Sequence, residues 1–552
     1  MCGIWALIGK SGISYETLFK AFMKIKHRGP DRSEFFMVED ILPVMVCFHR
    51  LSIMDLTSRA DQPFVWESNG STNYCICNGE IYNYKKLIEK YDLHPESDSD
   101  CHVIPLLYEK IGIDKLLEEL NGEFSFLIIT LKHSEKIIDI YACTDPCSVR
   151  PLFYLEDSTS IAFSSELIGL INDNKPLFGE VKRFPPGHIM HVKFEKETIT
   201  KNIYKYFDIE SDESLVDQYN LNDYECAKNA IREVFTQCVV DRLYAYRPIG
   251  AFLSGGLDSS LICSIASKYL KDVKNETLET FSIGMPDATD PICAKKISEF
   301  IGSKHYNYTL SEQDFIDHLE NKVIEHIGSY DITTVRASTG QDLLSYKISQ
   351  DTNIKVLLSG DGSDELTGGY KYFHNAPSEK EFHDECIFRM NDICLYDGLR
   401  VDRGVSANGL EVRVPFLDKR FIKLYLSIPV KFRVPYKGIE KYLLRDAFRG
   451  YLPDDLLFRS KEAFSDGVSS MKKSWFQIIQ EKADEKYSST WEDEVNKYKI
   501  NTPYSSEGLY YRKIFESIYG DDKSVAETIP YFWLPKWSGG IKEPSARVLD
   551  VY

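Results

Sequence analysis

Cysteine directly follows the initiator methionine in the opening segment MCGIW. A small residue at position 2 usually permits removal of Met1, and Cys2 would then carry a thiol and a free amine on one residue. Together these groups could serve as nucleophile and base. The alternative is an ordinary cysteine near a chain end. The three letters MCG do not decide between the two, because short motifs often occur by chance.

A second stretch with chemical character is GAFLSGGLDSSLICSIASKYL, which predicts a buried strand, a loop of small residues and a helix. Ser254, Gly255, Gly256, Ser259 and Ser260 would let backbone N–H groups approach an anion, and the helix N-terminus adds a partial positive charge. This geometry suits a pyrophosphate. It differs from the G-x4-GK[ST] loop of ordinary NTPases because no lysine follows the glycines. A tight strand–helix turn with glycines for packing is the alternative.

The segment VLLSGDGSDELTGGY predicts a similar loop after another strand. Asp258 in the first loop and Asp364 in the second could then both face the C-terminal edge of one sheet, where ligands of open α/β folds bind. Two carboxylates beside a triphosphate are a natural magnesium site. Either acid could instead cap a helix N-terminus, which is a common role of aspartate.

The elements that would position these groups differ between the two halves of the chain. Up to about residue 205, short β-rich runs such as VMVCFHRLSI and FSFLIIT predict mainly antiparallel strands with a few helices. The acidic stretch FDIESDESLVDQYNLND then predicts a linker. Beyond it, apolar runs such as PIGAFL and IKVLLSG alternate with helical patterns, which predicts a parallel sheet covered on both faces. With 552 residues, we expect two domains of unlike architecture.

The composition is that of a soluble globular protein and disfavours several kinds of binding partner. Hydrophobic residues make up 43% and charged residues 27%, as in ordinary globular proteins. The net charge of -18 disfavours binding to nucleic acid or anionic membranes. We find neither a signal peptide nor a membrane span, so we expect a cytoplasmic location. The 13 cysteines fit reduced thiols, and the closest pairs, Cys75/Cys77 and Cys143/Cys147, lack the spacing of a structural zinc site.

Several motifs stand in one order along the chain. They are MCGIW, HRGPD (27–31), FHRLSIMD (48–55), NGEIYN (78–83), SDC (99–101), SGGLDSS (254–260), SGDGSDE (359–365) and KEAFSDG (461–467). Together with TVRAS and LEVRVPFLD (410–418), they resemble the glutamine-hydrolysing asparagine synthetases over essentially the whole chain. The resemblance implies an α+β N-terminal-nucleophile hydrolase sandwich at 2–205. It also implies an α/β parallel-sheet domain of the ATP-pyrophosphatase type at 220–540.

For the first domain, the resemblance implies that the Cys2 sulfur attacks the side-chain amide of glutamine while its own α-amine acts as base. The Asn78 side chain and the Gly79 N–H would stabilise the oxygen of the tetrahedral intermediate. The implied glutamine-binding residues are Arg50, Asn78, Gly79, Glu80 and Asp100. Of these, the arginine would bind the substrate carboxylate and Asp100 its ammonium, while the glutamate would help to hold the amino acid.

For the second domain, the resemblance implies that aspartate attacks the α-phosphorus of ATP and forms an aspartyl adenylate and pyrophosphate. Ammonia from the first domain would reach this intermediate through a tunnel. Magnesium would bind Asp258 and Asp364. The implied ATP-binding residues are Leu253, Ser254, Gly255, Gly256, Asp258, Ser259, Ser260, Ile283, Ser359 and Gly360. Lys461 matches a lysine expected near the phosphates and the intermediate.

One residue departs from the family pattern. Asp361 stands in SGDGSDE where these enzymes usually carry a glutamate linked to adenylate formation. We expect Asp361 to keep that role with a shorter side chain. The alternative is a residue that only caps a turn, since Asp-Gly is a common turn pair.

Two other functions remain open from the sequence. An enzyme with the same two domains could amidate a different carboxylate or close a ring, because fold does not fix the acceptor. A binding protein with a degenerate enzyme fold is the second option, but the intact candidate residues argue against it. The expected partners are glutamine, aspartate and ATP, without nucleic acid or membrane, and the resemblance leaves a homodimer open.

Overall fold

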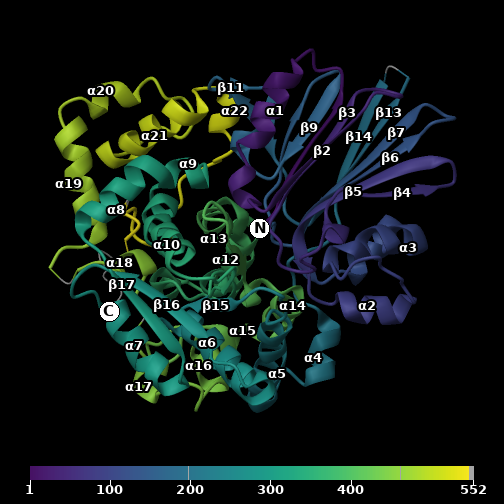
Figure 1. The fold of residues 1–552 in the computed structure, drawn as a ribbon. Coiled ribbons are helices and arrows are strands. Elements are labelled where there is room, and N and C mark those ends of the chain that lie inside the picture. Colours follow the sequence, from purple (N-terminus) through teal and green to yellow (C-terminus); the bar gives the residue numbers. More distant parts are fainter. Residues whose placement is uncertain (197, 461, 471, 542, 546–552) are drawn as a thin grey trace.

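The computed structural model describes residues 1–196, 198–460, 462–470, 472–541 and 543–545. Its N-terminal part contains two six-stranded antiparallel sheets (Figure 1). The strand order of the first sheet is β12 (Glu180–Arg183), β8 (Phe153–Glu156), β9 (Ser160–Ser164), β1 (Gly3–Gly9), β3 (Val44–Arg50) and β2 (Arg32–Val38). The order of the second is β14 (Thr198–Lys205), β13 (His188–Glu195), β7 (Ile137–Thr144), β6 (Gly122–Lys132), β5 (Ser71–Ile81) and β4 (Phe64–Ser68). A small hairpin pairs β10 (Ile171–Asn172) with β11 (Lys175–Pro176).

The two large sheets pack face to face around an apolar core. Alternate residues of a strand point to the same face, so Ile4 and Ala6 of β1 meet Ile76 of β5 and Leu127 of β6 in this core. The outer face of the second sheet is covered by α2 (Tyr84–Tyr91) and α3 (Val103–Glu119). On the outer face of the first sheet, α1 (Tyr15–Met23) packs beside the C-terminal part of the chain. This is the sandwich predicted from the sequence.

A five-stranded parallel sheet organises the C-terminal part. Its strand order is β17 (Lys304–Thr309), β16 (Glu279–Gly284), β15 (Ile249–Phe252), β18 (Val356–Leu358) and β19 (Glu411–Arg413). Helices α6 (Leu257–Tyr269) and α7 (Thr289–Ile301) pack on one face, and α10 (Ile332–Asp351) and α13 (Asp397–Ser406) on the other (Figure 1). The predicted parallel sheet with helices on both faces is therefore confirmed.

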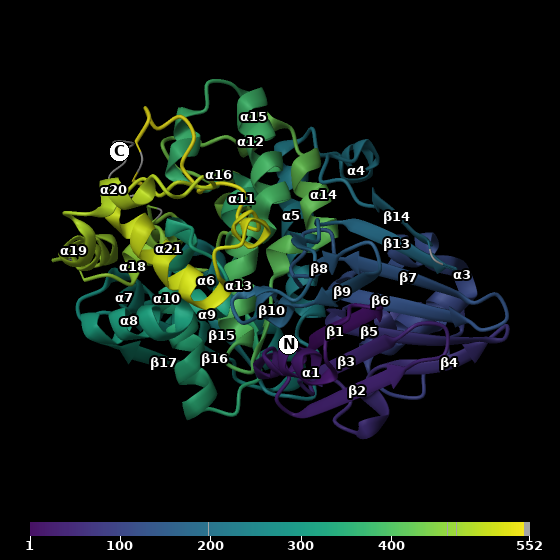
Figure 2. The same ribbon diagram turned by 90° about the horizontal axis from the view of Figure 1, so that it is seen from above.

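Further helices surround this sheet. They are α5 (Tyr224–Asp241), α8 (Glu312–His318), α9 (Ile324–Ile327), α11 (Ser363–Thr367), α12 (Glu379–Asp392), α14 (Lys419–Ser427), α15 (Val430–Arg433), α16 (Tyr442–Ala447), α17 (Asp454–Leu457), α18 (Phe464–Gly467), α19 (Trp475–Tyr487), α20 (Trp491–Val495), α21 (Ser506–Tyr519) and α22 (Lys523–Ala526). Figure 2 shows the antiparallel strands on one side of the molecule and most helices on the other. Among the described residues, no helix has both the length and the apolar character that a membrane crossing requires.

The stretch predicted as a linker, residues 207–223, joins the two parts but is not wholly irregular. It contains the helix α4 (Glu213–Tyr219). Asp212 caps this helix by accepting a hydrogen bond from Ser214 N at 3.0 Å, and Asp223 accepts one from Cys226 N at 2.9 Å at the start of α5. Two of the acidic residues that suggested a linker therefore act as helix caps.

The two parts of the chain are in direct contact. Arg28, in the HRGPD motif, donates from Nη1 to Glu166 at 2.7 Å and to Asp402 of α13 at 2.8 Å. The Met1 amine donates to Leu410 O at 3.1 Å, immediately before β19. The N-terminus thus lies against the parallel sheet, which brings the first residues of the chain close to the second part.

Candidate active sites

Cys2 lies at the start of β1, at the boundary between the sandwich and the parallel sheet. Its Sγ contacts Leu51 O at 3.7 Å. The thiol lines a small cavity of about 30 Å³. The other lining residues are Phe48, Arg50, Leu51, Ile53, Met54, Ala60, Gln62, Cys77, Gly79, Glu80, Ser99, Asp100, Cys101 and Glu411.

Burial changes the pKa values of the Cys2 thiol and of the neighbouring N-terminal amine. Burial raises the pKa of the Cys2 thiol to about 11, so the sulfur is protonated at neutral pH. Burial also lowers the pKa of the Met1 amine to about 6. A terminal amine in this environment is therefore largely neutral at pH 7, which is the state that can accept a proton.

Asn78 and Gly79 lie on β5. The surroundings of each residue explain why that residue type stands at its position. Asn78 is fully buried, and neither side-chain amide atom has a hydrogen-bond partner among the described residues. An unpaired buried amide is rare and leaves a donor available for a ligand. At position 79, a Cβ would lie 2.4 Å from Glu123 O, so only glycine fits. Gly79 lines the cavity, whereas Asn78 does not.

Arg50 lines the cavity, but its guanidinium is already bound by the loop that follows β3. Nη1 donates to Thr57 O at 2.6 Å and to Asp61 Oδ1 at 2.5 Å, and Nη2 donates to Met54 O at 3.2 Å. A bidentate bond to a substrate carboxylate would therefore replace some of these partners. In this state, Arg50 holds the loop of residues 54–61 against the cavity.

Asp100 and Glu80 place two carboxyl groups in the same cavity. Asp100 Oδ2 accepts a hydrogen bond from Ile81 N at 2.6 Å, and burial raises the pKa of Asp100 to about 6. The pKa of Glu80 is raised well above its usual range by burial and by the neighbouring Asp100 and Glu411. Arg413 partly offsets this crowding, since its Nη2 lies 3.0 Å from Glu80 Oε2. An incoming ammonium group would be attracted to this cluster.

Gln62 and Glu411 are among the residues of this cavity that sequence reasoning missed. The side-chain amide of Gln62 pairs with the backbone of Cys77 as a neighbouring strand would. Its Nε2 donates to Cys77 O at 3.2 Å, and its Oε1 accepts from Cys77 N at 2.6 Å. Glu411 comes from β19 of the parallel sheet and still lines the cavity around Cys2. The LEVRVPFLD motif, which contains Glu411, indicated the family but gave no sign of this location.

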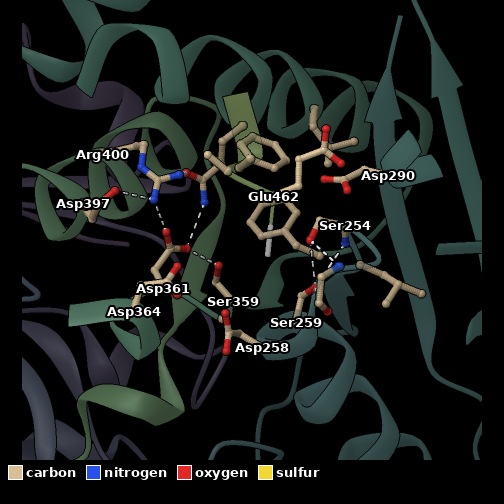
Figure 3. Close-up of a pocket in the computed structure, with 18 of the residues that line it drawn as sticks. Ser254, Asp258, Ser259, Asp290, Ser359, Asp361, Asp364, Asp397, Arg400 and Glu462 are labelled. Atoms are coloured by element: carbon tan, nitrogen blue, oxygen red, sulfur yellow. Dashed lines mark hydrogen bonds and ion pairs between the residues drawn. The ribbon is translucent and has the colours of Figure 1, made fainter. Parts of the chain in front are cut away.

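The second cavity lies at the carboxyl edge of the parallel sheet (Figure 3). The loops that follow β15 and β18 both line it. These strands are neighbours, but the chain proceeds from β15 outward through β16 and β17 before it returns to β18. Such a reversal of strand order opens the crevice where α/β sheets bind their ligands. The cavity volume is about 180 Å³.

The loop after β15 has the geometry expected of an anion-binding turn. Gly255 adopts a positive φ of 83°, and Gly256 caps the N-terminus of α6. The hydroxyls of Ser254 and Ser259 lie 3.0 Å apart. The loop after β18 packs directly against this turn, because a Cβ on Gly360 would lie 2.7 Å from Ser259 N. Glycine at position 360 therefore lets the two loops meet.

Most of the residues predicted to contact ATP line this cavity. They are Leu253, Ser254, Gly256, Asp258, Ser259, Ile283, Ser359 and Gly360. The remaining two, Gly255 and Ser260, do not line it. Ser260 is fully buried and donates from Oγ to Gly256 O at 2.5 Å, so it supports the shape of the loop from behind.

Asp258 and Asp364, the predicted metal ligands, also line the cavity. Each lies in the first turn of its helix, where Gly256 and Gly362 are the N-cap residues, so neither aspartate is the cap. The described residues contain no group of three or more His, Cys, Asp or Glu side chains that could hold a metal ion. Two carboxylates fit magnesium when phosphate oxygens supply further ligands.

Asp361 points across the cavity toward Arg400 of α13 (Figure 3). Its carboxylate accepts hydrogen bonds from Arg400 Nη2 and Ser359 Oγ, and Gln341 Nε2 lies 3.4 Å away. These contacts involve other elements of the fold, so Asp361 does more than cap its own turn. Lys461, the other predicted catalytic residue of this site, lies outside the described residues.

The sequence did not predict a network of polar side chains on the Arg400 side of this cavity. Arg400 also donates to Asp397 Oδ1 at 2.7 Å, and Tyr370 donates to Asp397 Oδ2 at 3.1 Å. Glu365 lines the same wall, and burial with Asp397 nearby raises its pKa well above the usual range. Arg400 and Asp397 belong to the segment DGLRVDRG, which has no distinctive spacing, so the sequence offered no signal for them.

Comparison with known proteins extends these observations to the whole chain. The family model described as asparagine synthase matches residues 230–381 and 375–537, and the glutamine amidotransferase domain model matches residues 1–177. The asparagine synthetase (glutamine-hydrolyzing) of Gallus gallus is 39% identical over 575 residues, covering 100% of this chain and 99% of the relative. The protein of the same description from Rattus norvegicus is 38% identical over 576 residues, with the same coverage.

The human protein of this description is 38% identical over 578 residues and again covers 100% of this chain. This similarity extends over the whole chain and includes both parts that carry the candidate sites. The chain belongs to the family of glutamine-hydrolysing asparagine synthetases.

Proposed function

We propose that this protein is a carbon–nitrogen ligase that makes asparagine from aspartate, glutamine and ATP. Glutamine is hydrolysed to glutamate and ammonia at the Cys2 site. Aspartate is activated at the parallel-sheet site as an aspartyl adenylate, with release of pyrophosphate, and ammonia then displaces AMP. The observation that carries the proposal is that the second part of the chain contributes a residue to the first site. Glu411 of β19 lines the Cys2 cavity, while the carboxyl end of the neighbouring strand β18 leads into the ATP cavity.

At the first site, removal of Met1 would expose the Cys2 amine as the base for its own thiol. Because the pKa of the thiol is raised to about 11, attack on the glutamine amide requires such a base. The intermediate would gain hydrogen bonds from Asn78 and from the Gly79 N–H. Arg50 and Asp100 would bind the carboxylate and ammonium of glutamine, and Glu80 would support the amino acid near Arg413.

At the second site, the small-residue loop after β15 would hold the phosphates of ATP with its backbone N–H groups and the N-terminus of α6. The residues proposed to hold a magnesium ion are Asp258 and Asp364, and when bound the ion would offset the charge that develops on the leaving pyrophosphate. Asp361 and Arg400 would position the aspartate carboxylate for attack on the α-phosphorus. Lys461 is proposed to lie near the phosphates on the basis of its motif alone.

Further parts of the proposal concern the chain as a whole. We place the glutaminase domain at 2–205 and the synthetase domain at 220–540, with a protected path for ammonia between them. A protected path is needed because free ammonia would mostly be protonated in water. The 13 free cysteines suit a reducing, cytoplasmic compartment. A homodimer belongs to the same proposal and is tested by the mass of the protein in solution.

The experiment that tests the proposed reaction measures AMP formation by the purified protein with glutamine, magnesium and ATP. Aspartate should support AMP and asparagine formation in equal amounts. Glutamate and a β-amino acid serve as competing acceptors. If one of these supports AMP formation and aspartate does not, the chain amidates another carboxylate or closes a ring. ADP as the product would contradict the assignment of the α-phosphorus as the point of attack.

A further inference from the structure

A buried lysine lies behind the two aspartates of the ATP cavity. Lys441 Nζ contacts both oxygens of Asp258, at 2.8 and 2.9 Å, and lies 2.5 Å from Asp364 Oδ1 and 3.1 Å from Ser363 Oγ. The lysine side chain is only 1% exposed. It is not among the described residues that line the cavity, so it reaches a ligand there only through the two carboxylates.

The local backbone is shaped to bring this ammonium group into place. Lys441 adopts a left-handed conformation with φ 56° and ψ 29°, which residues other than glycine seldom do. Gly369 makes room for the contact, because a Cβ there would lie 1.9 Å from Lys441 Cε and 2.1 Å from Asp364 Oδ1. Strain of this kind is kept where the surrounding structure requires a particular side-chain position.

The acidic residue next to Lys441 in the chain is already paired elsewhere. Glu440, the residue before the lysine, accepts a hydrogen bond from Arg445. Lys441 therefore forms its ion pairs with Asp258 and Asp364 and not with Glu440. One ammonium group offsets half of the charge of two carboxylates, so the aspartates attract a divalent cation less strongly than they would without the lysine.

We propose that Lys441 is a positioning residue that holds Asp258 and Asp364 side by side and offsets half of their charge, so that the metal ion binds tightly only together with the triphosphate. The inference rests on the proposed function in taking these aspartates as the metal ligands. ATP supplies the missing negative charge and the additional oxygen ligands. The site thus stays free of bound metal until the nucleotide arrives.

The test is a titration of the full-length protein with Mn²⁺, a paramagnetic substitute for magnesium, followed by electron paramagnetic resonance. It is run with and without α,β-methylene ATP, an analogue that cannot release pyrophosphate. Wild-type protein should bind Mn²⁺ weakly alone and tightly with the analogue. Lys441→Met should bind Mn²⁺ alone at least about tenfold more tightly, because one compensating charge is gone. Lys441→Arg, which keeps the charge, is the matched control and should bind Mn²⁺ alone as weakly as wild type.

Glutamine hydrolysis measured on each variant reports whether the chain is folded, since the Cys2 site does not use Lys441. If Lys441→Met fails to fold, Lys441→Gln provides the same test, because its amide can still donate toward the aspartates but carries no charge. It should also bind Mn²⁺ alone more tightly than wild type. Unchanged Mn²⁺ affinity in the folded variants would overturn the role of Lys441. Absence of Mn²⁺ binding in wild type even with the analogue would instead overturn the metal site itself, and the inference with it.

Discussion

The two candidate sites are built in opposite ways. The residues around Cys2 come largely from within or beside the strands of a packed sandwich, and the cavity there is about 30 Å³. Those of the ATP site come from loops at the ends of parallel strands, and the cavity is about 180 Å³. Strand register fixes the first set, whereas glycine-rich turns and charge pairs fix the second. We therefore expect changes at one site to leave the chemistry of the other largely intact.

The largest separation between the sites is expected from Cys2→Ala. Only the first site uses the thiol, so glutamine-dependent synthesis should fall below detection while synthesis from ammonium salts continues. The measurement is asparagine formed per minute with each nitrogen source. Loss of both activities in a folded variant would show that the sites are not separable in this way.

A comparable change at the second site is Asp361→Ala. Removing the carboxylate that contacts Arg400 should reduce adenylate formation by about 100-fold or more, since small errors in positioning have such effects. Transfer of ¹⁸O from aspartate to AMP measures this step, and glutamine hydrolysis should continue. Asp361→Glu should keep label transfer working. Normal transfer in the alanine variant would reduce Asp361 to a turn residue.

Arg50→Lys should have an intermediate effect, confined to glutamine. Lysine keeps the charge but loses the planar pair of donors, so the KM for glutamine should rise about tenfold or more. The KM values for aspartate and ATP should stay within about twofold. Because Arg50 also holds the loop of residues 54–61, a thermal unfolding curve is the control for stability. An unchanged glutamine KM would remove Arg50 from the binding site.

The smallest effect expected is a pH dependence of glutamine binding. Burial raises the pKa of Asp100 to about 6, so this carboxylate loses its charge below that pH and no longer attracts the substrate ammonium. Between pH 7 and pH 5 the KM for glutamine should rise about tenfold, because about one Asp100 in ten remains ionised at pH 5. In Asp100→Asn the KM should be high throughout, with a flat profile. The same slope in the variant would assign the effect to another group.

The sequence predicted the two-part architecture because the order of elements differs. Short β-rich runs fill the chain up to about residue 205, and apolar strands alternate with helical patterns beyond the linker. The sequence also predicted the cavity loops, because glycine and serine spacing is a local property. It did not predict Glu411, Arg413, Arg400 or Lys441. These residues reach their sites through the packing of distant elements, which no local pattern reports. The acids of residues 207–223 suggested a linker because capping and solvation favour the same residue types.

We propose that one chain moves nitrogen from glutamine at the sandwich site to aspartate at the parallel-sheet site. The most direct measurement supplies the purified protein with glutamine labelled with ¹⁵N in its side-chain amide, together with aspartate, magnesium and ATP, and analyses the products by mass spectrometry. We expect asparagine with ¹⁵N in its side-chain amide, formed in equal amounts with AMP and pyrophosphate. Glutamate and labelled ammonia without labelled asparagine, in protein that still forms AMP, would contradict it.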